Sequence, residues 1–339
     1  MTLANNHLMD FGEDGLTATL GMVDASGMHS VGAGKDIAAA SKPLVLAFDG
    51  VRIGILARCE VQFGIATDRR PGLAPFDATV YQAIRKLKQE TDVVIASIHA
   101  AAEMYPWPSP KRQDTWRALI EAGADVVHGH HAHVPQGWES YEGGLIFYGL
   151  GNLCVDPAKW LHHPHTLWSL APELSWTGRQ LSMHPATAVI EDRGDTVRVR
   201  DASPREAETH QCYLANCNRP LSDRRLLEGL WQEASIRMYR HHYAGWLGFE
   251  QSSSIPPGLR RCTREVLHRL RRFLGYEPMR TAIPPRQLTQ GQYLLWYHLF
   301  ACDSHNDAIA TALGVLGGTL EDLRSAATAR LIDEMMPSM

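Results

Sequence analysis

The sequence of 339 residues lacks the features that define several classes of protein. Its longest apolar stretches, such as residues 92–98, are far too short to cross a bilayer. The residues after Met1 have neither the basic region nor the apolar core of a secretory signal peptide. The formal charge of −4 provides no general attraction for nucleic acid or for an anionic membrane. These absences favour a globular protein that is cytoplasmic as the sequence stands and has no nucleic-acid partner.

Cysteine is also sparse. The six cysteines show none of the short paired spacings that hold structural zinc, and a chain of this length needs no disulfide scaffold. We therefore expect most of them to be buried free thiols in a reducing compartment.

Histidine, in contrast, is abundant: the chain has 17, and four of them lie between residues 128 and 133. This group follows a predicted buried strand at residues 124–127, and α/β proteins place ligand sites at the carboxyl ends of such strands. In extended backbone His131 and His133 face the same way, whereas His130 faces elsewhere unless the chain turns. Imidazoles at this spacing suit Zn, Mn or Fe. The alternative is a polar loop of surface histidines.

A second candidate ligand, His99, ends the preceding buried strand at residues 92–98. If the two strands are parallel neighbours, its side chain lies beside the loop of His130–His133. Glu103 follows, and is either an acceptor that orients an imidazole or a solvated loop acid. The alternative is that His99 is a structural residue, as a lone histidine at a strand end often is.

The N-terminal residues supply a third group. Asn5 and Asn6 offer neutral carboxamide oxygens, and His7 is a candidate for proton transfer. Asp10, three residues later, is within reach to orient the His7 ring. Taken alone, this segment is also compatible with an ordinary turn.

Strand and helix patterns alternate up to about residue 205, and helical periodicity dominates after it. Two hairpins are predicted, around Asp49-Gly50 and around Arg193-Gly194-Asp195. Predicted helices occupy residues 13–25, 78–88, 111–122, 221–243, 258–274, 289–300 and 320–335. The helix at 258–274 carries six arginines, which are either a polyanion site or a solvated face. His162, His163 and His165 are expected on a surface loop or at a pocket mouth, and His241-His242 on a helix surface.

Taken together, the motifs resemble the CapA family of bacterial capsule and poly-γ-glutamate synthesis proteins, over about residues 3–157. The matching stretches are Leu3-Ala4-Asn5-Asn6-His7 with Asp10 and Gly12, Val31-Gly32-Ala33-Gly34, His99 with Glu103, residues 123–134 around Gly129-His130-His131 and His133, and Ile146 to Asn152.

This resemblance implies a calcineurin-like metallophosphoesterase fold, an αββα sandwich over residues 1–205, with residues 206–339 as a helical accessory region. By analogy, Asn6, His99, His131 and His133, with His130 close by, would ligate one or two divalent ions. His7, oriented by Asp10, would be the catalytic proton donor. Asn5, Glu103 and Asn152 are expected to contact substrate or to support the ligands.

Two departures from the family pattern affect the prediction. Ala100-Ala101 stand where the family usually has Trp-Gly, which alters the pocket shape. The family's Gly-Asp and Asn-x-Glu segments, which supply acidic ligands, precede a motif that begins here at residue 3. We therefore expect an N-terminal segment to be missing from the sequence; the alternative is a shortened paralogue that binds metal poorly. A missing segment with an anchor would make the protein extracytoplasmic.

The sequence thus predicts a metal-dependent hydrolase of a phosphoester or a glutamyl amide in capsule or poly-γ-glutamate synthesis. The alternative is a non-catalytic component of the same machinery that binds the anionic polymer.

Overall fold

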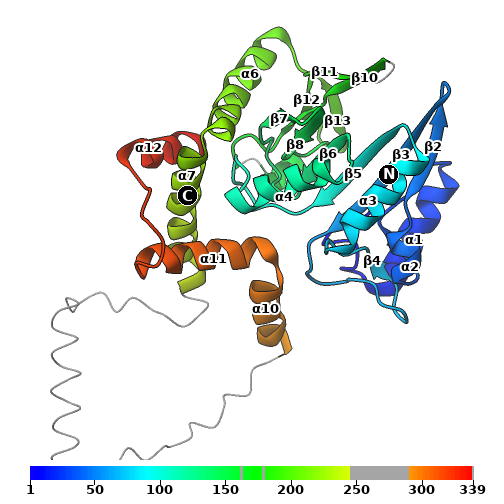
Figure 1. The fold of residues 1–339 in the computed structure, drawn as a ribbon, viewed down its shortest axis with the longest axis horizontal. Helices are drawn as coiled ribbons and strands as arrows, with labels where there is room; N and C mark the ends of the chain where they lie inside the picture. The colour runs from blue at the N-terminus through cyan, green and yellow to red at the C-terminus, as the bar shows by residue number, and fades with distance from the viewer. Residues whose placement is uncertain (161–162, 178–179, 245–289, 338–339) are drawn as a thin grey trace, which may run out of the picture.

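The computed structural model describes residues 1–160, 163–177, 180–244 and 290–337 (Figure 1). The helices are α1 (Gly12–Ala25), α2 (Ile37–Ser41), α3 (Thr79–Glu90), α4 (Pro110–Glu121), α5 (Pro157–Trp160), α6 (Pro204–Asn218), α7 (Arg224–Met238), α10 (Gln290–Ala301), α11 (Asp303–Leu316) and α12 (Ala326–Met335), with a 3₁₀ turn η1 (Arg219–Ser222) and a π-helical turn η2 (Tyr239–Tyr243). The helix predicted over residues 258–274, with its arginines, lies outside the described residues.

The strands form one large sheet and three small ones. They are β1 (Ala33–Gly34), β2 (Leu44–Phe48), β3 (Val51–Cys59), β4 (Gly72–Leu73), β5 (Val93–His99), β6 (Val126–His130), β7 (Trp138–Tyr141), β8 (Gly144–Phe147), β9 (Trp168–Leu170), β10 (Glu173–Thr177), β11 (Gln180–His184), β12 (Thr187–Asp192) and β13 (Val197–Asp201). The large sheet has six strands in the order β2-β3-β5-β6-β8-β7, and a three-stranded sheet has the order β13-β12-β9. This central mixed sheet with its helices confirms the predicted α/β class.

The direction of the strands in the large sheet determines where the strand ends meet. Strands β3, β5, β6 and β8 are parallel, and the edge strands β2 and β7 are antiparallel to their neighbours. The predicted hairpin joins β2 to β3, with Asp49 at φ 50° and Gly50 at φ 80°, the left-handed pair that a two-residue hairpin turn requires. Cys59, His99 and His130 are register partners across three parallel strands, so the chain leaves these strands at one edge.

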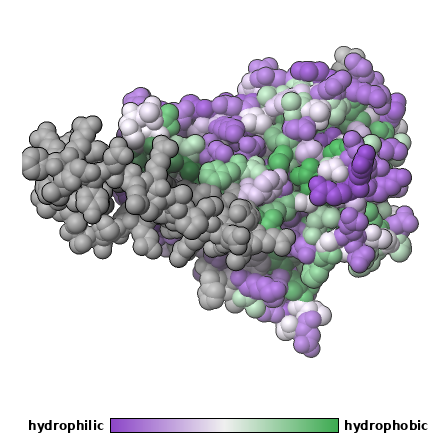
Figure 2. Space-filling model, turned by 90° about the horizontal axis from the view of Figure 1, so that it is seen from below, coloured by the Kyte–Doolittle hydropathy of each residue, from purple (hydrophilic) through white to green (hydrophobic). Residues whose placement is uncertain are grey.

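The two faces of the large sheet enter different hydrophobic cores. Consecutive residues of a strand point to opposite faces, and Leu145 and Phe147 of β8 accordingly join one core while Ile146 joins the other. One face packs against α3 and α4, through residues such as Ile84 and Trp116. The other face packs against β9, α6, α7 and α12. The large sheet therefore lies between two packed layers. On the face of the molecule seen in Figure 2, hydrophilic and hydrophobic residues are interspersed.

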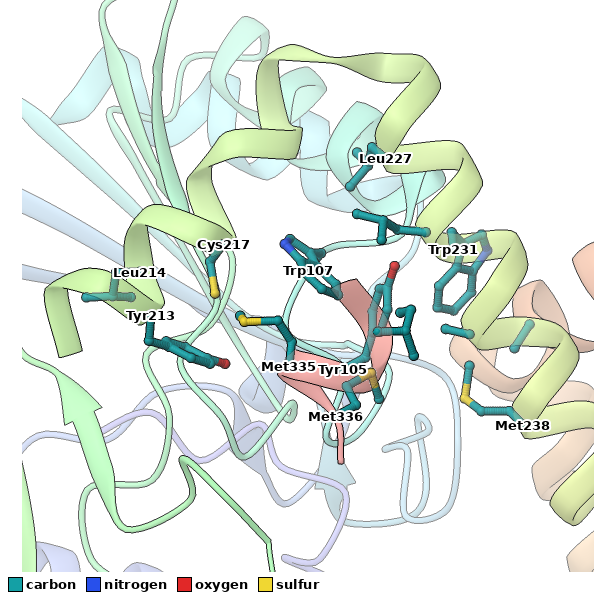
Figure 3. Close-up of a cluster of buried hydrophobic side chains, with 14 of the residues drawn as sticks. Tyr105, Trp107, Tyr213, Leu214, Cys217, Leu227, Trp231, Met238, Met335 and Met336 are labelled. Atoms are coloured by element: carbon teal, nitrogen blue, oxygen red, sulfur yellow. The ribbon is translucent and has the colours of Figure 1, made fainter. Parts of the chain in front are cut away.

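The C-terminal helices share a core with the α/β part of the chain. Figure 3 shows Met335, the last residue of α12, and Met336, which follows it, close to Tyr105 and Trp107, which follow β5, and to Tyr213 of α6. All five of these side chains are at least 94% buried from solvent, because their relative exposures do not exceed 6%. The division at residues 205 and 206 stays a prediction, and the shared core shows that the helices after it cover one face of the sheet.

Several predicted element boundaries in the C-terminal region are wrong. The helix predicted at 320–335 begins only at Ala326, because Ser325 and Thr328 form a capping box there, and α11 before it was not predicted. The helix predicted at 221–243 begins at Arg224, where Asp223 caps it, and ends in the π turn η2. Strands β7, β9, β10 and β11 and helix α6 were also missed, although the Ser203–Glu206 capping box marks the start of α6 in the sequence.

Candidate metal centre

The carboxyl edge of the large sheet collects polar side chains from three neighbouring strands. Glu60 directly follows β3, His99 ends β5, and His130 ends β6. The side chains of His99 and Glu60 are buried, with exposures of 3% and 0%. The rings of His99 and His131 are only 4.6 Å apart between centroids, so the loop after β6 lies over the end of β5.

Three residues of the loops that follow β5 and β6 bring potential metal-ligand atoms together. One ligand atom from each of Glu103, His131 and His133 lies within 4.8 Å of the other two, in the part of the chain that the structure describes. His131 and His133 have positive φ values of 96° and 62°, which non-glycine residues seldom adopt and which concentrate at functional sites. The two histidines therefore converge through left-handed turns beyond the end of β6. The sequence analysis attributed their convergence to extended backbone, and that explanation is wrong.

A neighbouring side chain fixes the orientation of His133. Its Nδ1 lies 3.0 Å from Oδ1 of Asn152, and the Asn152 amide in turn donates to the Thr166 carbonyl at 3.1 Å. Since that amide donates through its nitrogen, its oxygen accepts the proton on His133 Nδ1. This arrangement leaves Nε2 of His133 with a free lone pair, the form in which imidazole binds a metal.

His131 is buried and carries an unused polar atom. Burial lowers its pKa to about 4, with a smaller opposing effect of Glu103, so the imidazole is neutral at pH 7. Its Nε2 lies 3.5 Å from Glu60 Oε1 and 3.9 Å from Glu103 Oε1. Its Nδ1 is buried and has no hydrogen-bond partner among the described residues. A buried nitrogen without a partner is costly unless something outside the chain occupies that position.

Asn6 and His99 meet each other at the same edge. Asn6 Oδ1 lies 2.9 Å from Nε2 of His99, and Nδ1 of His99 lies 2.6 Å from Nδ1 of His130. His130 Nε2 in turn lies 3.2 Å from the hydroxyl of Ser97. Burial lowers the pKa of both histidines far below the usual value, so all members of this chain of hydrogen bonds are neutral. The structure thus brings Asn6 and His99 beside His131, while His130 faces Ser97 and His99 and lies outside the group of Glu103, His131 and His133.

The remaining N-terminal residues form an exposed turn. His7 Nδ1 lies 2.9 Å from Asp10 Oδ2, with side-chain exposures of 64% and 54%. Asn5 Oδ1 accepts a hydrogen bond from the His7 backbone N–H at 2.8 Å, so its side chain shapes the turn. The turn is held close to the sheet because Leu3 pairs with Val31 and Ala4 packs against Gly32, where an added Cβ would approach to 2.8 Å.

Glu60 is the residue at this edge that the sequence analysis missed. Its carboxylate accepts hydrogen bonds from the Ser304 hydroxyl at 2.8 Å, from the Ser304 N–H at 3.2 Å and from Gln62 at 3.1 Å, and Arg112 lies 3.4 Å away. A signal was present, because Glu60 follows a parallel strand just as His99 does. Glu60 connects the candidate centre to the first turn of α11.

A cavity of about 480 Å³ opens beside the centre. His131 and Glu103 line one part of it, and residues of α7, η2, α11 and α12 line another part. His163 and His165 also line it, which supports the pocket-mouth alternative for that segment, whereas His162 lies outside the described residues. His241 and His242 line the cavity as well as being exposed, so the prediction of a plain helix surface there is incomplete.

The fold and this edge define an α/β protein with a candidate metal centre at the carboxyl ends of parallel strands. A family model described as "Bacterial capsule synthesis protein PGA_cap" matches residues 1–157. The capsule biosynthesis protein CapA of Bacillus anthracis is 33% identical over 163 residues, which cover 46% of this chain and 40% of that protein. The PGA biosynthesis protein CapA of Bacillus subtilis is 36% identical over 157 residues, which cover 45% of this chain and 41% of that protein. Residues 1–157 match the capsule synthesis family, which confirms the resemblance to CapA that the motifs predicted.

The similarity covers only part of each relative. This chain spans less than half the length of these curated relatives. A solved structure of a hypothetical protein from Thermus thermophilus aligns with a TM-score of 0.36 and 16% identity over 60% of this chain and 76% of that one, too low to support an argument. Among the described residues, none of the helices has the length and apolar composition needed to cross a membrane.

Proposed function

We propose that the chain is a metal-dependent hydrolase whose centre is formed by Glu103, His131 and His133. The proposal depends on the convergence of one ligand atom from each of these three residues within 4.8 Å, together with the left-handed backbone of the two histidines. Strained backbone of this kind persists only where the surrounding structure compensates for it. Asn152 supports the proposal, because it leaves a nitrogen of His133 free for a ligand.

The residues fit a divalent ion chemically. Two imidazoles and one carboxylate match the donor set of catalytic zinc sites, and imidazole also suits Mn and Fe. An ion in the site would offset the cost of burying Nδ1 of His131, which has no hydrogen-bond partner among the described residues. Asn6 and His99 lie next to this group and could act as ligands of a second ion. Their mutual hydrogen bond would then be lost.

The protein's own residues would position the substrate and supply a proton. The chemistry that a divalent ion supplies in such a centre is Lewis acidity toward a phosphoryl or carbonyl oxygen and activation of water. Asp10 holds the Nδ1 side of His7, and Nε2 of the same ring would donate a proton to the leaving group. Glu60 orients the His131 loop relative to α11.

The names of the relatives connect the family with capsule and PGA biosynthesis, so we propose the same setting for this chain. The candidate reactions are hydrolysis of a phosphoester and of a glutamyl amide. A non-catalytic role in binding the anionic polymer is the competing function.

The test uses the full chain loaded separately with Mn, Fe and Zn. It measures release of p-nitrophenol from p-nitrophenyl phosphate and release of glutamate from oligo-γ-glutamate. Turnover that His133→Ala abolishes, while the exposed His184→Ala retains it, would support the proposal. Binding of oligo-γ-glutamate without turnover in any metal form would establish the competing function instead.

A further inference from the structure

We propose that the cavity beside His131 binds an uncharged, largely apolar part of the substrate, so that the substrate is a small amphiphile with one reactive anionic group. This inference rests on the proposed function and names its substrate class. It disfavours a polyanionic chain as the group held in the cavity.

The size and position of the cavity suit part of a small molecule. Its volume of about 480 Å³ falls within the range typical of ligand pockets. His131 and Glu103 belong both to its lining and to the candidate metal centre. A molecule whose reactive group lies at the centre therefore extends into the cavity.

Four methionines are among the described residues that line the cavity. Met238 comes from α7, Met335 and Met336 come from α12 and its end, and Met104 follows the β5 loop. Figure 3 shows Met336 and Met238 near one another beside Tyr105. Methionine side chains are flexible and polarisable, and they adapt to apolar ligands of varied shape. The C-terminal helices thus supply a wall that would accommodate apolar groups of varied shape.

The charges around the cavity argue against a polyanion. The described residues that line it include no lysine or arginine, and Glu103 is their one carboxylate. Burial lowers the pKa of His165 and of His305 to about 4, so both are neutral at pH 7. Moving several carboxylates out of water into such a site costs far more than moving methylene groups.

The backbone of one segment that lines the cavity is also unusual. His241, His242 and Tyr243 belong to the π-helical turn η2, and all three line the cavity. Single π turns within α-helices are rare and often mark functional sites. This turn follows α7 and brings its side chains to the wall of the cavity.

The experiment measures binding of methyl-, butyl-, hexyl- and octylphosphonate to the full, Mn-loaded chain by isothermal titration calorimetry. Each methylene buried in the cavity should tighten binding about fourfold. Tri-γ-glutamate is the competing probe, and its binding more tightly than hexylphosphonate would overturn the inference. Equal dissociation constants across the phosphonates would overturn it as well.

Neutral n-alkanols, from butanol to octanol, separate this inference from the proposed function. They are titrated into metal-free protein, where binding that tightens with chain length supports an apolar subsite even if no metal binds. If metal and methylphosphonate bind but neither series gains with chain length, the inference fails and the proposed function stands. If the chain binds no metal but alkanol binding tightens with chain length, the proposed function fails and the apolar subsite stands.

A pair of variants locates the effect. Met336→Gln keeps the side-chain length but adds a polar end, and should reduce the gain per methylene at least twofold while leaving Mn content and methylphosphonate affinity unchanged. Met336→Leu should retain the gain, because it conserves volume and polarity. An unchanged gain in a folded Met336→Gln protein would contradict the assignment of this wall.

Discussion

Glu60 Oε1 lies 3.5 Å from Nε2 of His131, while Oε2 of the same carboxylate accepts from the hydroxyl and the backbone N–H of Ser304. One fully buried carboxylate therefore contacts both the loop after β6 and the first turn of α11. A buried carboxylate is retained only where hydrogen bonds and positive charge compensate for its desolvation. Glu60 is the point at which the helices after residue 290 connect with the candidate centre.

Replacing Glu60 should test this connection through stability. Glu60→Gln removes the negative charge beside Arg112, itself 8% exposed, and leaves that guanidinium without its compensating partner. We expect the free energy of unfolding to fall by about 3 kcal/mol, measured by urea denaturation. The double variant Glu60→Gln with Arg112→Met should lose less than the sum of the single changes. Equal urea midpoints for Glu60→Gln and the parent would refute the account.

Asn152 should control metal affinity through His133. Asn152→Ala removes the acceptor that fixes the Nδ1 proton, and loss of such a partner typically weakens metal binding about 10- to 100-fold. Asn152→Asp keeps an acceptor oxygen and serves as the matched control. The measurement is competition for Zn against a chromophoric chelator, and an unchanged affinity in Asn152→Ala would exclude the proposed role.

His7 should contribute to turnover but not to metal content. His7→Ala should lower kcat about 10²- to 10⁴-fold, the usual contribution of general acid catalysis, with metal content unaltered. Asp10→Asn should cause a smaller loss, because it keeps a hydrogen-bonding group beside His7 Nδ1. Loss of metal together with His7 would instead make this residue a ligand.

The metal-free fold should weaken in mild acid. Burial lowers the pKa of His128, His131, His165 and His305 to about 4 each in the folded protein. Their pKa values in the unfolded chain are near the ordinary value of about 6.5, so between about pH 6.5 and 4 the unfolded chain binds more protons. The free energy of unfolding should therefore fall by up to about 1.4 kcal/mol per pH unit for each histidine.

Urea unfolding of chelator-treated protein at pH 7.5 and pH 5.0 measures this effect. We expect a clearly lower midpoint at pH 5.0, and a weaker pH dependence in His305→Phe. The same midpoint at both pH values would mean that these imidazoles are not buried in the neutral form.

The sequence predicted the elements whose signals are local. The Asp49-Gly50 turn specified the β2–β3 hairpin, and the continuous apolar run at residues 92–98 predicted a buried central strand. The parallel register of β5 and β6 then followed, and with it the meeting of His99 with the loop of His130 to His133. The family motifs extended the prediction to Asn6 and Asn152, which the structure brings beside those histidines.

Other features depend on contacts between distant parts of the chain. Ser304 meets Glu60 across 244 residues, and no local pattern encodes that contact. The cavity likewise combines His131 with His241 and Met336 from separate helices. The left-handed backbone of His131 and His133 was missed because histidine carries no strong preference for it, unlike glycine. Gly317 and Gly318 did mark the end of α11, but the helix before them lacks a side-chain cap at Cys302.

The central claim is that Glu103, His131 and His133 hold a divalent ion. The most direct measurement is the Mn, Fe and Zn content of the purified full chain by elemental analysis, compared among the parent, His131→Ala, His133→Ala and the exposed His184→Ala. The account predicts at least one ion per molecule in the parent and in His184→Ala, and a loss of more than tenfold in the other two variants. Metal content that is negligible in the parent, or equal in all four proteins, would contradict it.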